Sequence, residues 1–369
     1  MNKTKTISAF GIAGVYIGTL IGAGFASGQE ILQFFVLYGL WGIVGLLFVT
    51  GLFIFFGYVI MELAFELKSR SHLEIIRKVS GPWLGRFVDV IITFFLLAGF
   101  VVMSAGAGAI FSEQFGLSPW LGSGVMIIIS LLTIFMGVAG IINSMSVLVP
   151  VLLFSVLAVC FLTLVNNQIS LSELKFTRSN LGVGGNWLLS ALLYVSYNMV
   201  VAVAVLAPIG QMVKQKVTLL KGAVIGGFSL GLSALAIHLA LLASLPEAAN
   251  FEVPMVFLAG KLAPFYNVAY IIVLLLGIYT TAVGSLFGFL ARILGMDSPK
   301  IKIYSPLIGI FALGASQFGF STLVKIIYPA VGYAGLLLLA GLSYGKLRQS
   351  IIYGVAVAKP LLKKGGKKE

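Results

Sequence analysis

The chain has 369 residues, of which 60% are hydrophobic and only 9% are charged. A mean hydropathy of +1.10 excludes a water-soluble globular domain, because such a domain cannot hide this much apolar surface from water. The formal net charge of +13 calls for no nucleic-acid partner, since anionic lipid headgroups attract the basic segments that flank membrane spans. We therefore expect an integral membrane protein whose partner is the lipid bilayer.

Ten apolar stretches are long enough to cross about 30 Å of hydrocarbon, which takes roughly 20 helical residues. In chain order they cover residues 8–36, 40–63, 85–112, 119–140, 143–165, 185–212, 220–244, 264–292, 303–319 and 322–344. Trp41, Trp83, Trp120 and Trp187 each fall at the start of a stretch, where an indole ring favours the headgroup level. The sequence thus predicts an all-α membrane protein with ten transmembrane helices.

The orientation follows from Lys and Arg, because cationic loops stay on the cytoplasmic side. An even number of spans puts both termini on one face. We expect a plasma-membrane protein with both termini in the cytoplasm, because the cytoplasmic segments then hold most of the basic residues. Only four of the 24 Lys and Arg residues lie elsewhere, namely Lys175, Arg178, Lys261 and Lys325.

The polar segment 166–187 separates the first five stretches from the last five. An odd number of spans in each half inverts the second half relative to the first, as in many transporters that work by alternating access. We therefore expect a first five-helix repeat, 1–165, and a second inverted repeat, 185–345. An extracellular connector, 166–184, joins them, and a basic cytoplasmic tail, 346–369, follows.

Glycines and an acid interrupt the first apolar stretch in LIGAGFASGQEILQFF, residues 20–35. A signal peptide, small-residue helix packing and kink tolerance are alternative interpretations. Unpaired backbone costs several kcal/mol per group in lipid, so a non-helical segment persists only where it lines a cavity. Gly22 and Gly24 lower helix propensity there and leave room for a ligand. They predict a broken first helix whose free N–H and C=O groups can hold an anion and a cation.

The sixth stretch carries a polar cluster near its middle, and corresponding interruptions in two halves point to the binding site of a repeat-built transporter. We expect the sixth helix to be broken as well, with the substrate between the two interruptions. The small residues 105–107 of the third stretch leave room for a ligand beside them. The predicted substrate-binding residues are Gly22, Ala23, Gly24, Ser196, Tyr197 and Asn198. Packing alone is the alternative role for the tyrosine.

The segment IGAGFASG, residues 21–28, resembles the first-helix signature of the amino acid–polyamine–organocation (APC) superfamily of LeuT-fold transporters. Members of that superfamily often carry a Gly-x-Gly break preceded by Ile. Within it, the chain is most similar to a bacterial membrane family distantly similar to branched-chain amino acid carriers. The resemblance implies the LeuT fold, with ten helices in 5+5 inverted repeats and with helices 1 and 6 broken.

The resemblance also implies a sodium site between the first and eighth helices. Sodium-coupled members use two carbonyls of the first helix, and a small residue followed three positions later by paired hydroxyls. Gly277, Thr280 and Thr281 have this spacing on one helical face, and the glycine match adds the carbonyls of Gly18 and Ile21. Alternatively, both threonines bond back to their own helix. In some proton-coupled or uncoupled relatives a Lys of the fifth helix fills the ion site. The fifth stretch of this chain contains no Lys, which leaves the site to a cation.

We expect a secondary active transporter that carries a small solute, an amino acid or related zwitterion, by sodium-coupled alternating access, with sodium transported rather than held as a prosthetic group. A transporter-derived ligand sensor of the spore-germination type is an alternative, since those subunits of the superfamily have about this length and ten spans. An enzyme is not expected, because His72 and His238 are the only histidines and no acid cluster or Ser-His pairing accompanies them.

Glu30 is an acid inside a predicted span, and such acids are rare and usually paired. The only cation inside a span is Lys325, near the outer end of the tenth stretch. In the LeuT fold the outer halves of helices 1 and 10 face each other, so the resemblance implies an ion pair that gates the outer vestibule. Alternatively, Lys325 extends to the headgroups, or Glu30 is a proton-coupling carboxylate.

Overall fold

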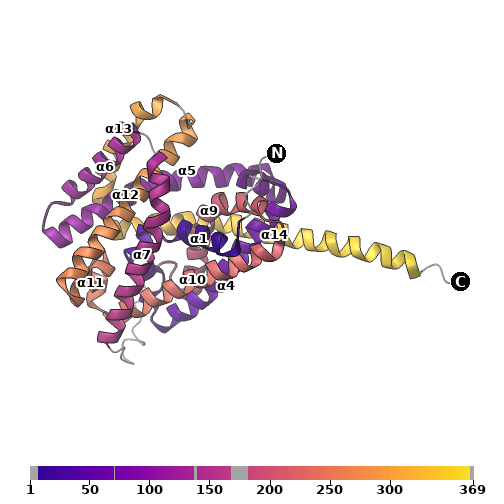
Figure 1. Cartoon of the computed structure of the whole chain (residues 1–369), viewed down its shortest axis with the longest axis horizontal. Helices are drawn as coiled ribbons and strands as arrows, with labels where there is room; N and C mark the ends of the chain where they lie inside the picture. The colour runs from indigo at the N-terminus through magenta and orange to yellow at the C-terminus, as the bar shows by residue number, and fades with distance from the viewer. Residues whose placement is uncertain (1–6, 70, 137–138, 168–181, 297, 366–369) are drawn as a thin grey trace.

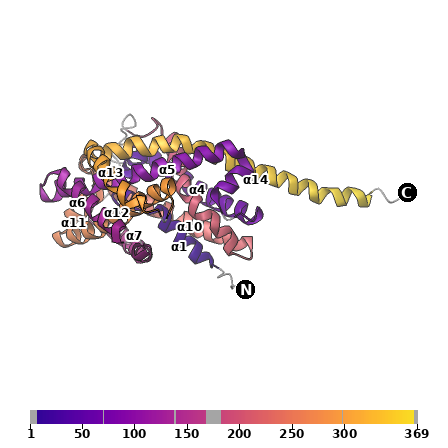
Figure 2. The same cartoon turned by 90° about the horizontal axis from the view of Figure 1, so that it is seen from above.

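A computed structural model of the chain describes residues 7–69, 71–136, 139–167, 182–296 and 298–365. Every regular element in these ranges is helical (Figures 1 and 2). The α-helices are α1 (Ala9–Leu20), α2 (Ala23–Ala26), α3 (Gln29–Phe34), α4 (Leu40–Glu66), α5 (His72–Phe115), α6 (Pro119–Met136), α7 (Ala139–Asn166), α9 (Trp187–Ile209), α10 (Lys216–Leu242), α11 (Pro254–Leu262), α12 (Pro264–Leu294), α13 (Lys300–Ala315) and α14 (Phe320–Gly365). The short 3-10 helices are η1 (Val36–Tyr38), η3 (Gly210–Met212), η4 (Glu247–Asn250) and η5 (Ser316–Phe318).

Nine helices in the described ranges are long and apolar enough to cross a membrane, so the chain is a multi-pass membrane protein. They are α4, α5 from Gly81 onward, α6, α7 from Leu148 onward, α9 with η3, α10, α12, α13 with η5, and α14 as far as Arg348. The first of the ten predicted stretches is divided among α1, α2 and α3, and α1 has only 12 residues. The structure therefore has nine long helices and one divided stretch where ten helices were predicted.

The backbone between α1 and α2 is extended at Ile21 (φ −84°, ψ 91°) and Gly22 (φ −109°, ψ −173°). The N–H of Gly22 donates to Leu20 O at 3.2 Å. In a continuous helix this N–H would instead donate to Gly18 O. The interruption thus frees a carbonyl of α1 from the helical ladder.

The prediction of a second interruption, at residues 196–198, is wrong, because α9 is one continuous helix from Trp187 to Ile209. The polar side chains of this cluster find partners without opening the helix. Asn198 Nδ2 donates to Tyr194 O one turn earlier, at 2.9 Å, and Ser196 Oγ donates to Gly332 O of α14 at 2.6 Å. Helix-internal and interhelical hydrogen bonds therefore satisfy them.

The helices pack in two groups that α14 connects. One group contains α1, α4, α9 and α10, and the other contains α5, α6, α12 and α13. The long helix α14 packs along both α9 and α5, and its C-terminal part extends beyond the other helices (Figure 1). The functional cavities described below lie between these two groups.

Small residues let α10 approach its neighbours closely. A Cβ at Gly226 would lie 2.8 Å from the Tyr16 ring of α1, and a Cβ at Gly227 would lie 2.7 Å from Ile54 of α4. Close backbone approach at small residues is a main source of helix association in lipid, where the hydrophobic effect between helices is weak. Tyr16 also donates its hydroxyl to Phe53 O at 2.8 Å, which joins α1 to α4.

A network of ion pairs joins α4, α10 and α14 at the end of the bundle where α4 ends. The buried carboxylate of Glu62 pairs with Lys346 of α14 and lies 3.5 Å from Lys216 Nζ of α10. Lys216 also pairs with Glu66, and Tyr58 donates its hydroxyl to Glu62 at 2.9 Å. The network ties α14 to the helix group that contains α1.

Candidate functional site

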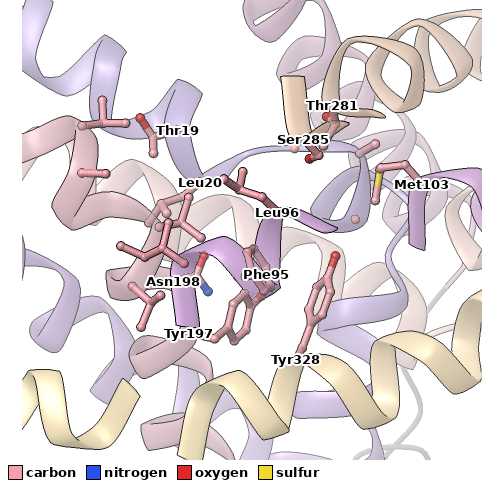
Figure 3. Close-up of a pocket in the computed structure, with 18 of the residues that line it drawn as sticks. Thr19, Leu20, Phe95, Leu96, Met103, Tyr197, Asn198, Thr281, Ser285 and Tyr328 are labelled. Carbon is pink, nitrogen blue, oxygen red and sulfur yellow. The ribbon is translucent and has the colours of Figure 1, made fainter. Parts of the chain in front are cut away.

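A cavity of about 360 Å³ lies beside the interruption between α1 and α2. Its walls come from the interrupted segment, α5, α9, α12 and α14, and they are mostly apolar (Figure 3). Its volume falls in the range of small-molecule sites, roughly 300–1,000 Å³. The structure therefore offers room for a small solute between the two helix groups.

Glu30, in the first turn of α3, lines this cavity and is only 6% exposed. Tyr197 of α9 donates its hydroxyl to Glu30 Oε2 at 2.5 Å. The carboxylate packs against the backbone of Gly24, since a Cβ there would collide with Glu30 Oε1 and would lie 3.0 Å from Tyr328 Oη. The absence of a side chain at Gly24 thus creates the space that the carboxylate occupies.

Three aromatic rings from three helices gather beside Asn198 in this cavity, as Figure 3 shows. The ring centroids of Tyr197 and Tyr328 are 5.0 Å apart. Phe95 of α5 lies 5.6 Å from the Tyr328 ring and 6.3 Å from the Tyr197 ring. Together the three rings form an aromatic wall next to the carboxylate.

A second cavity, of about 240 Å³, adjoins the first at the interruption, because Gly22 and Ala23 line both. The two cavities share lining residues of α5 and α12, including Thr281 and Ser285. The second cavity is lined by all the residues of the predicted sodium site, Gly18, Ile21, Gly277, Thr280 and Thr281. The structure therefore gathers these five residues around one space.

The hydroxyls of the second cavity are hydrogen-bonded to their own helix. Thr280 and Thr281 both donate to Gly277 O, at 3.1 and 2.8 Å. Hydrogen bonds from both threonines to their own helix were the alternative to a sodium site in the sequence analysis. A donating hydroxyl oxygen keeps its lone pairs, so the bonds are compatible with binding a cation.

Five of the six predicted substrate-binding residues line the first cavity, namely Gly22, Ala23, Gly24, Tyr197 and Asn198. Ser196 does not, because its buried hydroxyl faces Gly332 of α14. The small residues 105–107 of the third stretch, which were predicted to leave room for a ligand, do not line either of the two cavities. A Cβ at Gly106 would lie 3.3 Å from the ring of Phe320, so α14 fills that space.

Three further residues that were not predicted from the sequence line the first cavity, namely Phe95, Tyr328 and Ser285. Ser285 lies one helical turn after Thr281 on the same face of α12, a spacing that could have revealed it. The two aromatic residues carry no such signal, because an aromatic side chain in an apolar helix is indistinguishable from a packing residue.

The predicted ion pair between Glu30 and Lys325 is absent from the described ion pairs. Lys325 is an exposed residue of α14, whereas Glu30 is buried against Tyr197. Tyr328, three residues further along α14, contacts the cavity instead. The rotation of α14 therefore turns the ring, and not the lysine, toward the carboxylate.

An ion pair lies where the first cavity reaches the last turn of α12. Arg292 lines the cavity, and its Nη1 atom lies 2.5 Å from Asp89 Oδ1 of α5. His72, at the start of α5, is near this pair, and its burial, together with the Arg292 charge, lowers its pKa to about 4. At this end the cavity is therefore bordered by an arginine whose positive charge is balanced by Asp89.

The segment that contains α2 and α3 contacts α11 and the first part of α12. Met255 N donates to Ser27 O at 3.0 Å, and Tyr270 donates its hydroxyl to Ala26 O at 2.5 Å. Gly28 has a positive φ of 81°, and a Cβ there would lie 2.7 Å from Met255. The segment α2–α3 is thus held under α11.

No family model matches the chain. The chain is 32% identical over 336 residues to the uncharacterised membrane protein YkvI of Bacillus subtilis (strain 168), a match that covers 91% of the chain and 95% of YkvI. The chain belongs to the YkvI family. Protein YyaD of the same organism is 31% identical over 324 residues, which cover 88% of the chain and 92% of YyaD.

Solved structures show the fold of this YkvI-family protein. An inward-facing conformation of Mhp1 matches with a TM-score of 0.62 and 13% identity, covering 92% of the chain and 76% of Mhp1. MhsT in complex with L-phenylalanine matches with a TM-score of 0.60 and 17% identity, covering 94% and 93%. A Na⁺-coupled sialic acid symporter matches with a TM-score of 0.56 and 12% identity, covering 86% and 77%. The chain therefore has the LeuT fold, as the sequence resemblance predicted.

Proposed function

We propose that this YkvI-family protein is a secondary active transporter that carries a small solute across the plasma membrane by sodium-coupled alternating access. The observation that carries the proposal is the interrupted first stretch, which borders a cavity of solute size and an adjoining cavity lined by all five residues of the predicted sodium site. Non-helical backbone at membrane depth is costly unless it lines such a cavity. The MhsT and sialic acid symporter structures support the proposal by analogy of fold.

In this proposal α1, α2 and α3 together make the first of ten crossings, and α9 makes the sixth. Residues 1–165 and 185–345 are the two inverted five-helix repeats, joined by the outer connector 166–184. Both termini and the basic tail 346–369 lie in the cytoplasm. The cavity then reaches toward the cytoplasm at Arg292, while α11 covers the outer end.

Sodium binds in the second cavity. The carbonyls of Gly18 and Ile21 are offered by the end of α1, where the Gly22 N–H has left the helical ladder. The carbonyl of Gly277 and the hydroxyls of Thr280 and Thr281 complete the oxygen ligands. Unwound backbone carbonyls are the usual sodium ligands in transporters with broken helices.

The solute binds in the first cavity against the backbone of residues 22–24, with Tyr197 and Asn198 beside it. An amino acid or related zwitterion suits free backbone groups of both kinds. One observation favours a second candidate, a proton-coupled transporter: Glu30 is a buried carboxylate inside the cavity. A ligand sensor would bind the same solute without moving it.

Sodium binding is tested by thermal unfolding of the purified protein in sodium, potassium and choline chloride of equal ionic strength. Sodium raises the melting temperature because it binds only the folded state. Thr281→Ala weakens this stabilisation, and Thr280→Ala combined with Thr281→Ala weakens it further. Thr93→Ala is the matched control, since Thr93 back-bonds to Asp89 O at 2.8 Å outside both cavities. Equal stabilisation by all three salts contradicts the sodium site.

A further inference from the structure

We infer that Glu30 is the ammonium-binding group of the first cavity, and that the solute is a protonated primary amine with an apolar body, for which a carboxylate is dispensable. The inference rests on the proposed function only in taking this cavity as the solute site. It assigns to Glu30 a role in binding the solute rather than in gating.

The first observation is a buried acid that lacks a cation. Glu30 is 6% exposed, and in the described part of the chain no Lys, Arg or His pairs with it. A carboxylate offers about four acceptor positions, and the Tyr197 hydroxyl uses one. Buried charges are paired as a rule, because an unpaired one costs several kcal/mol. A cationic solute in the cavity supplies the missing partner.

The second observation is the aromatic wall formed by Phe95, Tyr197 and Tyr328. Aromatic faces attract cations within about 6 Å of the ring centroid, and the attraction strengthens where water is excluded. Because the Tyr197 hydroxyl also bonds Glu30, the wall and the carboxylate adjoin. A carboxylate beside ring faces suits an ammonium group, which needs both charge and a desolvated surface.

The remaining walls indicate what the rest of the solute is. Val200, Val201 and Ala204 of α9, and Ile92 of α5, make an apolar lining. Among the described lining residues Arg292 is the one cationic side chain, and Asp89 already neutralises it. A carboxylate on the solute therefore has no free cationic side chain to bind, whereas an apolar body has a long matching surface.

The test is calorimetric binding to the purified full-length protein at neutral pH in sodium chloride. The probes are butylamine, hexylamine, 2-phenylethylamine and tryptamine, each compared with the alcohol of the same skeleton and, for the last two, with phenylalanine and tryptophan. At least one amine should bind at least as tightly as the matching amino acid, and its alcohol should bind roughly 30-fold more weakly or not at all.

Variants separate an ammonium site from other roles of the same residues. Glu30→Gln should weaken amine binding by roughly 30-fold or more, and Glu30→Asp should retain part of it. Tyr328→Leu should weaken binding about fivefold, whereas Tyr328→Phe, which keeps the ring, should change it less. Glu247→Gln, which alters an exposed acid paired with Lys261, is the control. Unchanged melting temperatures show that each variant is folded.

The inference is overturned if no amine binds, or if Glu30→Gln leaves amine affinity unchanged. If Glu30→Gln leaves amine affinity unchanged and removes a pH dependence of solute binding, the carboxylate is a proton site and not an ammonium site. The proposed function fails separately: amine binding that needs Glu30, without any sodium-coupled flux, keeps the inference and contradicts the transporter. Sodium-coupled flux that is indifferent to Glu30→Gln keeps the transporter and contradicts the inference.

Discussion

The substitution Gly24→Ala tests whether the position of the Glu30 carboxylate matters. One added methyl group would collide with Glu30 Oε1 and lie 3.0 Å from Tyr328 Oη. The carboxylate must then move, and its 2.5 Å hydrogen bond from Tyr197 is lost or lengthened. The change acts on the solute cavity without adding or removing a charge.

The size of the effect follows from two opposing contributions. Overpacking a tight site costs about 1–3 kcal/mol. Alanine in place of glycine inside the short helix α2 recovers up to about 1 kcal/mol of helix propensity. Net destabilisation should therefore be at most about 3 kcal/mol, which shifts the melting temperature by only a few degrees in a chain of this size. Solute affinity should fall much more, by about tenfold or more, because the displaced carboxylate is the group that binds.

The assay is amine affinity by calorimetry, with the melting temperature measured on the same samples. Gly14→Ala is the matched control, because Gly14 lies in α1 and a Cβ there would meet nothing within 4 Å. It should leave both quantities unchanged. Normal amine affinity in Gly24→Ala would show that the position of the Glu30 carboxylate does not matter for binding. Gly24→Leu, which fills the cavity further, should abolish transport while the protein still inserts into the membrane.

Three further outcomes follow from the structure. Glu62→Gln should lower the free energy of unfolding by about 1–3 kcal/mol, because it removes the charge that the buried Glu62 carboxylate contributes to its ion pairs with Lys346 and Lys216. The double variant Glu30→Lys with Lys325→Glu should transport solute into proteoliposomes no better than the worse of the two single variants, since the two side chains do not meet. Recovery of transport in the double variant would instead support a gate formed by Glu30 and Lys325. Burial lowers the pKa of His72 from 6.5 to about 4, so the unfolded state binds more protons and stability should fall as the pH drops from about 6.5 to about 4; a His72→Gln variant with the same slope would contradict this.

The parts of the site that depend on local sequence were predictable. Two glycines one residue apart disfavour a helix wherever the chain packs, and the structure has extended backbone at Gly22. Three residues at fixed helical spacing face one way, and Gly277, Thr280 and Thr281 line one cavity. The apolar stretches likewise indicated the long helices.

The parts that depend on tertiary contacts were not predictable. Whether a polar cluster breaks a helix depends on whether neighbouring helices offer hydrogen-bond acceptors to its side chains. Gly332 O of α14 is such an acceptor for the Ser196 hydroxyl. Which side of α14 faces the cavity depends on its rotation, which places Tyr328 inside and leaves Lys325 exposed. Charge and the LeuT-fold resemblance together predicted the region of α14 that faces Glu30, but not which residue of that region lies in the cavity.

Radioactive sodium entry into proteoliposomes is the most direct test of sodium-coupled solute transport by this protein, because it requires no labelled solute. Entry is measured with and without an external pool of amino acids and primary amines. If sodium and solute move together, the pool stimulates sodium entry, and combining Thr280→Ala with Thr281→Ala removes the stimulation while Thr93→Ala keeps it. Sodium entry that no solute changes, with proton entry rising instead under the same pool, would contradict sodium coupling.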